Sequence, residues 1–149
     1  MDITISTDPS RLDLDVIHGF LASSYWAAGI PRRVVERAVR HSLCFGAYDG
    51  AQQVGFTRVI SDFATYAYVS DMFVLPSHRG RGVGKRLMAA VRAHPDLQGL
   101  RRWTLFTRDA HALYRKHGFA EARYPDRLME ILCDPYRPAA ATAAGAAQA

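Results

Sequence analysis

The stretch from Tyr66 to Met88 constrains this chain most, because it places a glycine- and arginine-rich loop between a strand and a helix. Residues Tyr66 to Val74 are rich in aromatic and β-branched side chains, a composition typical of a strand. Pro76 ends the strand, since proline has no N–H group to donate to a ladder. Apolar residues then recur at helical spacing, which predicts a helix from Gly82 to about His94 with one buried face.

The loop between these two elements has the chemistry of an anion-binding site. Glycines remove the Cβ atoms that would hold a ligand away from the backbone. A helix start presents unpaired N–H groups and a partial positive charge, and arginine adds planar, permanently charged donors. Together these features predict a phosphate cradle. The alternative is a glycine-rich turn carrying solvated arginines.

The spacing of the glycines distinguishes between the known kinds of phosphate loop. The Walker pattern fails, because it requires a glycine where Arg79 stands and a serine or threonine where Arg86 stands. The dinucleotide pattern fails at Lys85, where a third glycine is needed. The pattern that fits is R-x-x-G-x-G, formed by Arg79, Gly82 and Gly84 directly after a strand ending in Val-Leu-Pro. It resembles the acyl-CoA pyrophosphate loop of the GNAT acetyltransferase superfamily.

A second segment, Ala112 to Phe119, resembles the last eight positions of another motif of the same family, a helix of the form A-x-x-L-Y-x-x-x-G-F whose first position falls on Ala110. A tyrosine has a reference pKa of about 10 and a thiol one of about 8.5, so tyrosine stays protonated at neutral pH and can donate to a departing thiolate. The resemblance implies that Tyr114 is the general acid that protonates the sulfur of coenzyme A. The alternative is a core tyrosine whose hydroxyl meets a backbone partner.

The resemblance also implies how acetyl-CoA is held as a co-substrate. In this family the strand before the loop splays from the next strand, and the pantetheine arm pairs with the exposed backbone. Many relatives carry an asparagine after the next strand, whereas this chain has Thr107-Arg108-Asp109, and Asp109 can instead cap a helix. The implied cofactor-binding residues are Met72, Phe73, Val74, Arg79, Gly80, Arg81, Gly82, Val83, Gly84, Lys85, Thr107, Asp109 and Tyr114.

The acceptor amine must be neutral when it attacks the thioester, so the reaction needs a base or a water relay. Asp71, Asp62, Tyr66 and His111 are the candidate bases, and the alternative for Asp71 is a hydrogen-bonded or surface strand residue. The family builds its acceptor pocket from the first two helices and their connection. The candidate substrate-binding residues are therefore Tyr25, Trp26, Arg58 and Tyr66. The alternatives are that Tyr25 and Trp26 anchor the bend between the helices and that Arg58 is a solvated strand arginine.

The remaining patterns complete a β-α-α-β-β-β-α-β-α-β-β order, which predicts an α/β fold with a mixed sheet and helices on both faces. This order matches the GNAT fold. The other predicted strands are residues 2–7, Leu43–Tyr48, Val54–Ser61, Trp103–Thr107, Phe119–Ala122 and Leu128–Leu132; the other predicted helices are Leu12–Ser24, one opened by Pro31, and Ala110–His117 with Asp109 as its cap.

At 149 residues the chain predicts one domain, residues 1–137, followed by an alanine-rich tail, residues 138–149, that we expect to be disordered. It contains no apolar run of membrane-spanning length and no visible signal peptide. Cys44 and Cys133 lie in strand-like apolar segments and are predicted to be buried free thiols, which favours a cytoplasmic location. No cysteine or histidine spacing predicts a metal site.

These observations favour an N-acetyltransferase that uses acetyl-CoA and acts on a primary amine of a small molecule or a peptide. A non-catalytic acyl-CoA sensor is the alternative. The net charge of +5 also allows nucleic-acid binding, but a basic patch for nucleic acid needs no fixed Gly-x-Gly at a helix start, so no nucleic acid is expected. Many family members dimerise, and a homodimer is therefore open.

Overall fold

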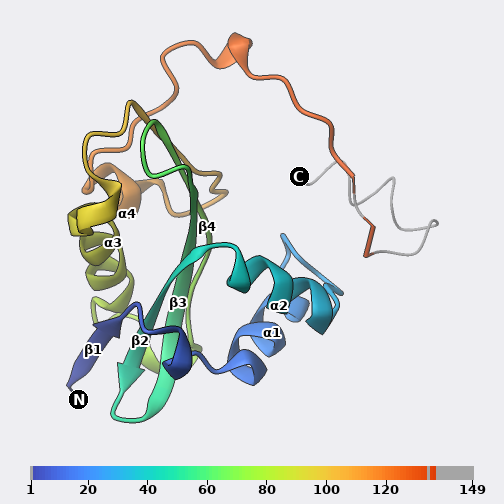
Figure 1. The fold of residues 1–149 in the computed structure, drawn as a ribbon, viewed down its shortest axis with the longest axis vertical. Coiled ribbons are helices and arrows are strands. Elements are labelled where there is room, and N and C mark those ends of the chain that lie inside the picture. The colour runs from blue at the N-terminus through green and yellow to red at the C-terminus, as the bar shows by residue number, and fades with distance from the viewer. Residues whose placement is uncertain (1, 134, 137–149) are drawn as a thin grey trace.

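The computed structural model describes residues 2–133, 135 and 136 (Figure 1). The predicted tail, residues 138–149, lies outside this range. The elements in chain order are β1 (Ile3–Ser6), α1 (Leu14–Ser23), α2 (Arg32–Arg40), β2 (Leu43–Asp49), β3 (Gln52–Ser61), β4 (Tyr66–Val74), α3 (Val83–Ala93), β5 (Arg102–Thr104) and α4 (His111–Arg115). Within the described ranges, no helix is both long enough and apolar enough to cross a membrane.

The strands form a single five-stranded sheet in the order β1-β2-β3-β4-β5. Neighbours from β1 to β4 are antiparallel, and β5 alone runs parallel to its neighbour β4. A parallel pair requires a crossover connection, which α3 supplies between β4 and β5. The predicted mixed sheet is confirmed.

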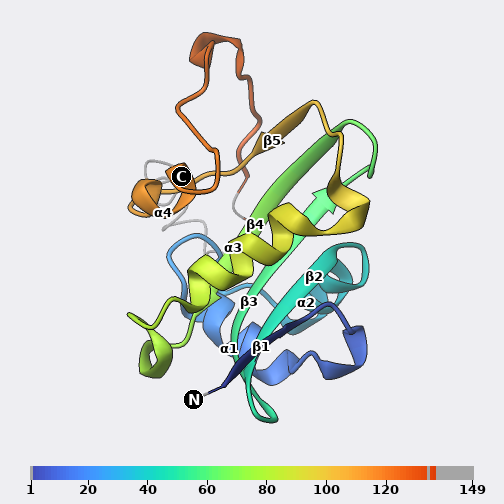
Figure 2. The ribbon, with the colours of Figure 1, turned by 90° about the vertical axis from the view of Figure 1, so that its left-hand side faces the viewer.

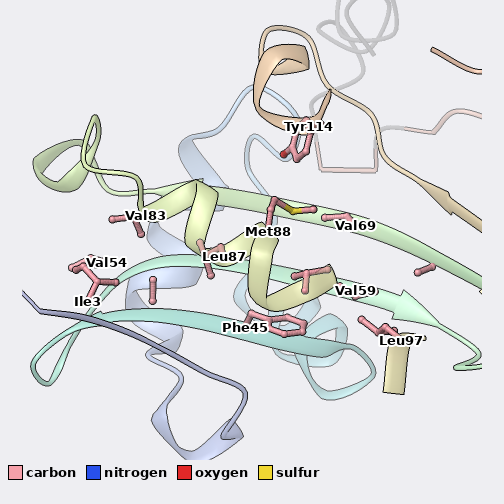
Figure 3. Close-up of a cluster of buried hydrophobic side chains, with 13 residues drawn as sticks. Ile3, Phe45, Val54, Val59, Val69, Val83, Leu87, Met88, Leu97 and Tyr114 are labelled. Carbon is pink, nitrogen blue, oxygen red and sulfur yellow. The ribbon is translucent and has the colours of Figure 1, made fainter. Parts of the chain in front are cut away.

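Helices cover both faces of this sheet, with α1 and α2 on one side and α3 and α4 on the other (Figures 1 and 2). Alternate strand residues point to opposite faces, so each face has its own apolar cluster. One cluster joins Ile17, Leu21 and Val35 to Cys44, Phe56 and Phe73. The other packs Val83, Leu87, Met88 and Val91 of α3 against Phe45, Val54, Val59 and Val69 (Figure 3). The sheet therefore fixes the position of β4, which is one of its strands, and of α3, which packs against it.

Five local predictions are wrong. Residues 119–122 and 128–132 form no strand, and β5 ends at Thr104 rather than Thr107. The helix α4 begins at His111 with Ala110 as its N-cap residue and no side-chain cap from Asp109; the Thr107 hydroxyl accepts the Ala110 N–H at 3.0 Å. Both cysteines are free, but Cys133 is exposed rather than buried, since the segment that contains it packs against no sheet.

Candidate active site

The two strands that lead into the site diverge along their length. β4 and β5 pair only from Tyr66 to Tyr68, opposite Arg102 to Thr104. β4 then continues to Val74, so among the described residues the side that faced β5 has no strand neighbour over the last residues of β4. This free backbone edge contains Met72, Phe73 and Val74, three of the residues implied for the cofactor.

A β-bulge shapes β4 just before its end. Arg58 lies opposite Ser70 and Phe56 lies opposite Phe73, so Asp71 and Met72 together face one residue of β3. Asp71 has a φ of 56°, a left-handed conformation that aspartate tolerates better than most residues. A bulge bends its strand, so β4 is expected to change direction at Asp71 and Met72.

Both carboxylate oxygens of Asp71 already have partners. The Trp26 indole Nε1 donates to Oδ1 at 2.9 Å, and the Arg58 Nε donates to Oδ2 at 2.5 Å. The Asp71 and Arg58 side chains are 9% and 17% exposed, and a second Arg58 nitrogen donates to the Ser42 hydroxyl at 3.2 Å. Asp71 therefore ties the bulge to β3 and to the α1–α2 connection, an arrangement that favours a structural role over that of a base.

After β4 the chain forms a tight loop held by backbone and side-chain contacts. The Leu75 N–H donates to the Val54 carbonyl at 2.8 Å, and Arg79 Nε donates to the Val74 carbonyl at 3.0 Å. His78 is buried and bonds through Nε2 to Asp49 Oδ2 at 3.0 Å. This last link anchors the loop to the end of β2, and sequence reasoning missed it because the two residues are far apart in the chain.

The glycines of the loop leave an open space in front of α3. Gly80 and Gly82 have φ values of 75° and 77°, and a Cβ built on either would meet no atom within 4 Å. Gly82 is the N-cap of α3, and no side chain caps this helix end. The first helical hydrogen bond runs from the Arg86 N–H to the Gly82 carbonyl at 3.0 Å, so the N–H groups of residues 83–85 lie ahead of it and are available to an anion.

The helix α4 places Tyr114 next to this loop. A Cβ built on Gly84 would lie 3.7 Å from Leu113 and 3.8 Å from Val74, which brings the ends of β4, α3 and α4 to one point. Tyr114 is 7% exposed and enters the α3 cluster from α4, on the side of Met88 (Figure 3). Its ring packs edge-on against Phe119 with centroids 6.0 Å apart.

Burial decides the proton affinity of Tyr114. Removal from water raises the pKa of Tyr114 to about 12, and the charges of Tyr25 and Asp109 add to this. Among the described residues no hydrogen bond involves its hydroxyl, whereas a core tyrosine normally finds a partner. The hydroxyl is therefore protonated at neutral pH, and its O–H group is available to donate a hydrogen bond or a proton.

Aromatic side chains border the same region on the side of α1. Tyr25 and Trp26 pack edge-on at 5.1 Å, and the Arg108 guanidinium lies 3.8 Å from the centre of the Tyr25 ring. This last contact bridges the α1–α2 connection and the β5–α4 loop. Phe20 stacks on Phe73 at 4.2 Å. Sequence reasoning did not single out Phe20 or Arg108, because neither belongs to a motif.

Tyr66 and Asp62 lie apart from this point. Tyr66 begins β4, about 26 Å of extended strand from Val74, and its hydroxyl bonds to Thr104. Asp62 accepts three backbone N–H bonds in an exposed turn, and the Thr65 hydroxyl and N–H hold the pKa of Asp62 well below its usual range. His111 and Asp109 are exposed at the start of α4. Over the part of the chain that the structure describes, no group of three or more metal-ligating side chains occurs.

Comparisons with known proteins agree with this geometry. Residues 40–121 match the profile of the Acetyltransferase (GNAT) domain. A Gibberella zeae protein named as an acetyltransferase is 33% identical, over 78% of this chain and 77% of the relative. The crystal structure of a Xanthomonas campestris pv. campestris protein assigned to the GNAT family is 53% identical, with a TM-score of 0.87 over 90% of this chain and 95% of that one.

A Clostridium acetobutylicum acetyltransferase described with acetyl-CoA has a TM-score of 0.63 over 88% of this chain and 95% of that one; at 15% identity, this likeness shows the fold alone. The profile match and the relatives at 33% and 53% identity show similarity in sequence as well as in fold. The chain belongs to the GNAT family of acetyltransferases.

Proposed function

We propose that this protein transfers the acetyl group of acetyl-CoA to a primary amine of a small molecule or peptide, by direct attack in a ternary complex. The observation that carries the proposal is the open glycine cradle at Gly80 and Gly82, directly before the uncapped start of α3. A pyrophosphate there would accept from the N–H groups of residues 83–85, with Arg79, Arg81 and Lys85 nearby to supply positive charge. The catalytic domain would be residues 1–137, and two free thiols suit the reducing cytoplasm.

The thioester would lie along the free edge of β4. Backbone groups of Met72, Phe73 and Val74 can pair with the amides of the pantetheine arm, since no strand of the described chain occupies that edge. An N–H group near Val74 can stabilise the oxyanion that forms when the amine attacks the carbonyl. Holding both substrates in one place supplies the proximity contribution to the rate.

Tyr114 would donate to the sulfur as the carbon–sulfur bond breaks. A tyrosine whose pKa is about 12 is a weak acid toward a thiolate in water. A thiolate leaving inside an apolar site also has a raised pKa, however, because burial disfavours its charge. Burial therefore raises the pKa values of both the Tyr114 hydroxyl and the departing thiol, so proton donation from one to the other stays feasible. Because the Tyr114 hydroxyl has no partner among the described residues, it favours catalysis over a purely sensing role.

The acceptor would approach from the side of Tyr25 and Trp26. Arg108 already covers the Tyr25 ring, whereas the Trp26 ring is 42% exposed and offers an apolar or cation-binding face. With both Asp71 oxygens engaged, an amine that arrives neutral or loses its proton to water fits the site better than one deprotonated by Asp71. A panel of primary amines, assayed for release of coenzyme A above the background hydrolysis, tests the proposal. If the protein binds acetyl-CoA but none of the amines increases the rate of coenzyme A release, the protein is a sensor.

The pH dependence of the rate should reflect the acceptor rather than Tyr114. Because the pKa of Tyr114 is about 12, its proton is present throughout the range from pH 7 to 10. We expect kcat to rise with pH as the amine deprotonates and then to reach a plateau. At pH values up to 10, kcat should not decrease again. Loss of thioester absorbance, corrected for hydrolysis, measures this. A fall in kcat with a midpoint near pH 8 would show that a different acid protonates the sulfur.

Asp71→Asn separates the structural role of Asp71 from a catalytic one. Asparagine tolerates the left-handed φ and can still accept from Trp26, so the change removes mainly the charge. Arg58 is then left partly buried without its counter-ion, and we expect the free energy of unfolding in urea to fall by about 3 kcal/mol. Replacing both partners, in Arg58→Met with Asp71→Asn, should restore part of that loss.

The kinetics of the same variant complete this test. Per folded molecule, kcat should stay within a few fold of the wild-type value if Asp71 only holds the bulge in place. A stable Asp71→Asn protein whose kcat collapses would instead identify Asp71 as the base.

A further inference from the structure

The acceptor side of the site carries an arginine that no sequence motif explains. Arg108 is exposed and lies in the loop between β5 and α4, the helix that carries Tyr114. Its guanidinium reaches across to the connection between α1 and α2, where it lies 3.8 Å from the centre of the Tyr25 ring. The contact therefore holds a permanent positive charge on the side from which the acceptor would approach.

Stacking on Tyr25 leaves the hydrogen-bonding groups of Arg108 available. A guanidinium on an aromatic ring uses its flat face, whereas its five N–H donors point outward in the plane of the group. Among the described residues, Arg108 forms no ion pair with a carboxylate. A planar donor that is held in place and lacks a carboxylate partner is suited to bind a carboxylate or phosphate of a ligand.

Arg58, the arginine that the sequence suggests for the acceptor, is already engaged. Its Nε donates to Asp71 Oδ2 at 2.5 Å, and a second nitrogen donates to the Ser42 hydroxyl at 3.2 Å. The cavity that Arg58 and Asp71 line together has a volume of about 10 Å³, which is room for about one water molecule. The Arg58–Asp71 pair is also neutral as a unit, so it does not offset the charge of Arg108.

The groups around Arg108 place it beside the reacting centre. Tyr25 and Asp109 both raise the pKa of Tyr114, so both lie near the hydroxyl that would protonate the sulfur. Arg108 stacks on the first of these residues and precedes the second in the chain. Trp26 packs edge-on against Tyr25 at 5.1 Å and is 42% exposed. An apolar surface therefore lies next to the arginine.

We propose that Arg108 is a specificity-determining residue that binds an anionic group, a carboxylate or a phosphate, on the acceptor amine. This inference rests on the proposed acetyltransferase function and narrows its substrate to primary amines that carry such a group. The guanidinium donates two N–H bonds to the anion, and the hydrocarbon part of the acceptor packs on the Trp26 ring. The same charge disfavours acceptors that carry only positive groups, such as polyamines.

Matched pairs of acceptors test this assignment. Phenylalanine is compared with phenylalaninamide, and phosphoethanolamine with ethanolamine, at saturating acetyl-CoA. The value of kcat/KM is expressed per neutral amine, because a nearby anion changes the pKa of the amine. For the wild-type protein we expect kcat/KM to be about tenfold higher for the anionic member of at least one pair, equivalent to about 1.4 kcal/mol. The pair that responds shows whether the anion is a carboxylate or a phosphate.

Variants at Arg108 show whether this residue causes the preference. In Arg108→Gln, kcat/KM for the anionic member should fall to that of the neutral member, chiefly through a higher KM. Arg108→Lys should keep part of the preference, because lysine retains the charge but lacks the planar fork. Arg11→Gln is the matched control, since Arg11 is exposed and lies 4.0 Å from the centre of the Tyr48 ring, in the turn Pro9–Arg11. It should leave the preference unchanged.

The outcomes separate this inference from the function on which it rests. Equal kcat/KM for both members of both pairs, or a full preference in Arg108→Gln, would overturn the role of Arg108 and leave the acetyltransferase function in place. Loss of acetyl-CoA affinity in Arg108→Gln, measured by calorimetry, would overturn it by assigning Arg108 to the cofactor site. No turnover with any acceptor, in a protein that binds acetyl-CoA, would refute the proposed function and the role of Arg108 with it.

Discussion

Tyr114→Phe is expected to lower kcat about 100-fold, the lower end of what one positioned general acid contributes, while the Kd of acetyl-CoA stays within about twofold. The ring keeps its packing against Phe119, and the hydroxyl has no hydrogen bond to lose among the described residues. Removal of the oxygen should therefore affect only the step in which the sulfur leaves. Release of coenzyme A with the best amine of the panel gives kcat, and calorimetry gives Kd.

Tyr124→Phe is the matched control, because Tyr124 is 49% exposed and lies outside the site. It should leave kcat, Kd and the unfolding midpoint unchanged. If Tyr114→Phe turns over at the wild-type rate, the general-acid assignment is wrong, whatever the state of acetyl-CoA binding.

Gly82→Ala is expected to weaken acetyl-CoA binding about 100-fold, equivalent to about 2.7 kcal/mol. The new Cβ would project into the open space in front of α3, where the phosphates need close approach to the backbone. The φ of 77° also strains alanine by about 1–2 kcal/mol. Both affinity and stability should therefore fall, and calorimetric titration and urea unfolding measure the two effects separately.

Gly99→Ala isolates the effect of backbone strain. Gly99 has a φ of 73° and, like Gly82, no atom within 4 Å of a built Cβ, but it lies beyond the other end of α3. Its substitution should cost about the same unfolding free energy and leave the Kd unchanged. Equal losses of affinity in the two variants would show that the Gly82 effect comes from general destabilisation and not from the cradle.

Local sequence signals were sufficient to predict β4 and α3, the two elements on either side of the glycine-rich loop. The predicted strand Tyr66–Val74 is confirmed at both ends, and the predicted helix Gly82–His94 differs from α3 by one residue at each end. Both elements have strong periodicity, a proline stop and glycines whose backbone conformation the loop requires. The candidate phosphate loop could be proposed from the sequence for the same reason, because all of its determinants lie within a few neighbouring residues.

Long-range interactions set the features that the sequence did not predict. Residues 128–132 have the composition of a strand, yet they pair with no other strand among the described residues. The sequence predicts Asp109 as the cap of α4, but Ala110 is the N-cap residue, and its N–H donates to the Thr107 hydroxyl. The role of Asp71 depends on Trp26 and Arg58, which approach it only in the folded chain.

Calorimetric titration of acetyl-CoA into the wild-type protein is the most direct test of the proposed cofactor site. We expect one binding site per chain, with a Kd in the micromolar to millimolar range typical of enzyme substrates, and displacement by pyrophosphate. No detectable binding at low salt and high protein concentration would contradict the assignment of the Gly80–Gly82 cradle to acetyl-CoA.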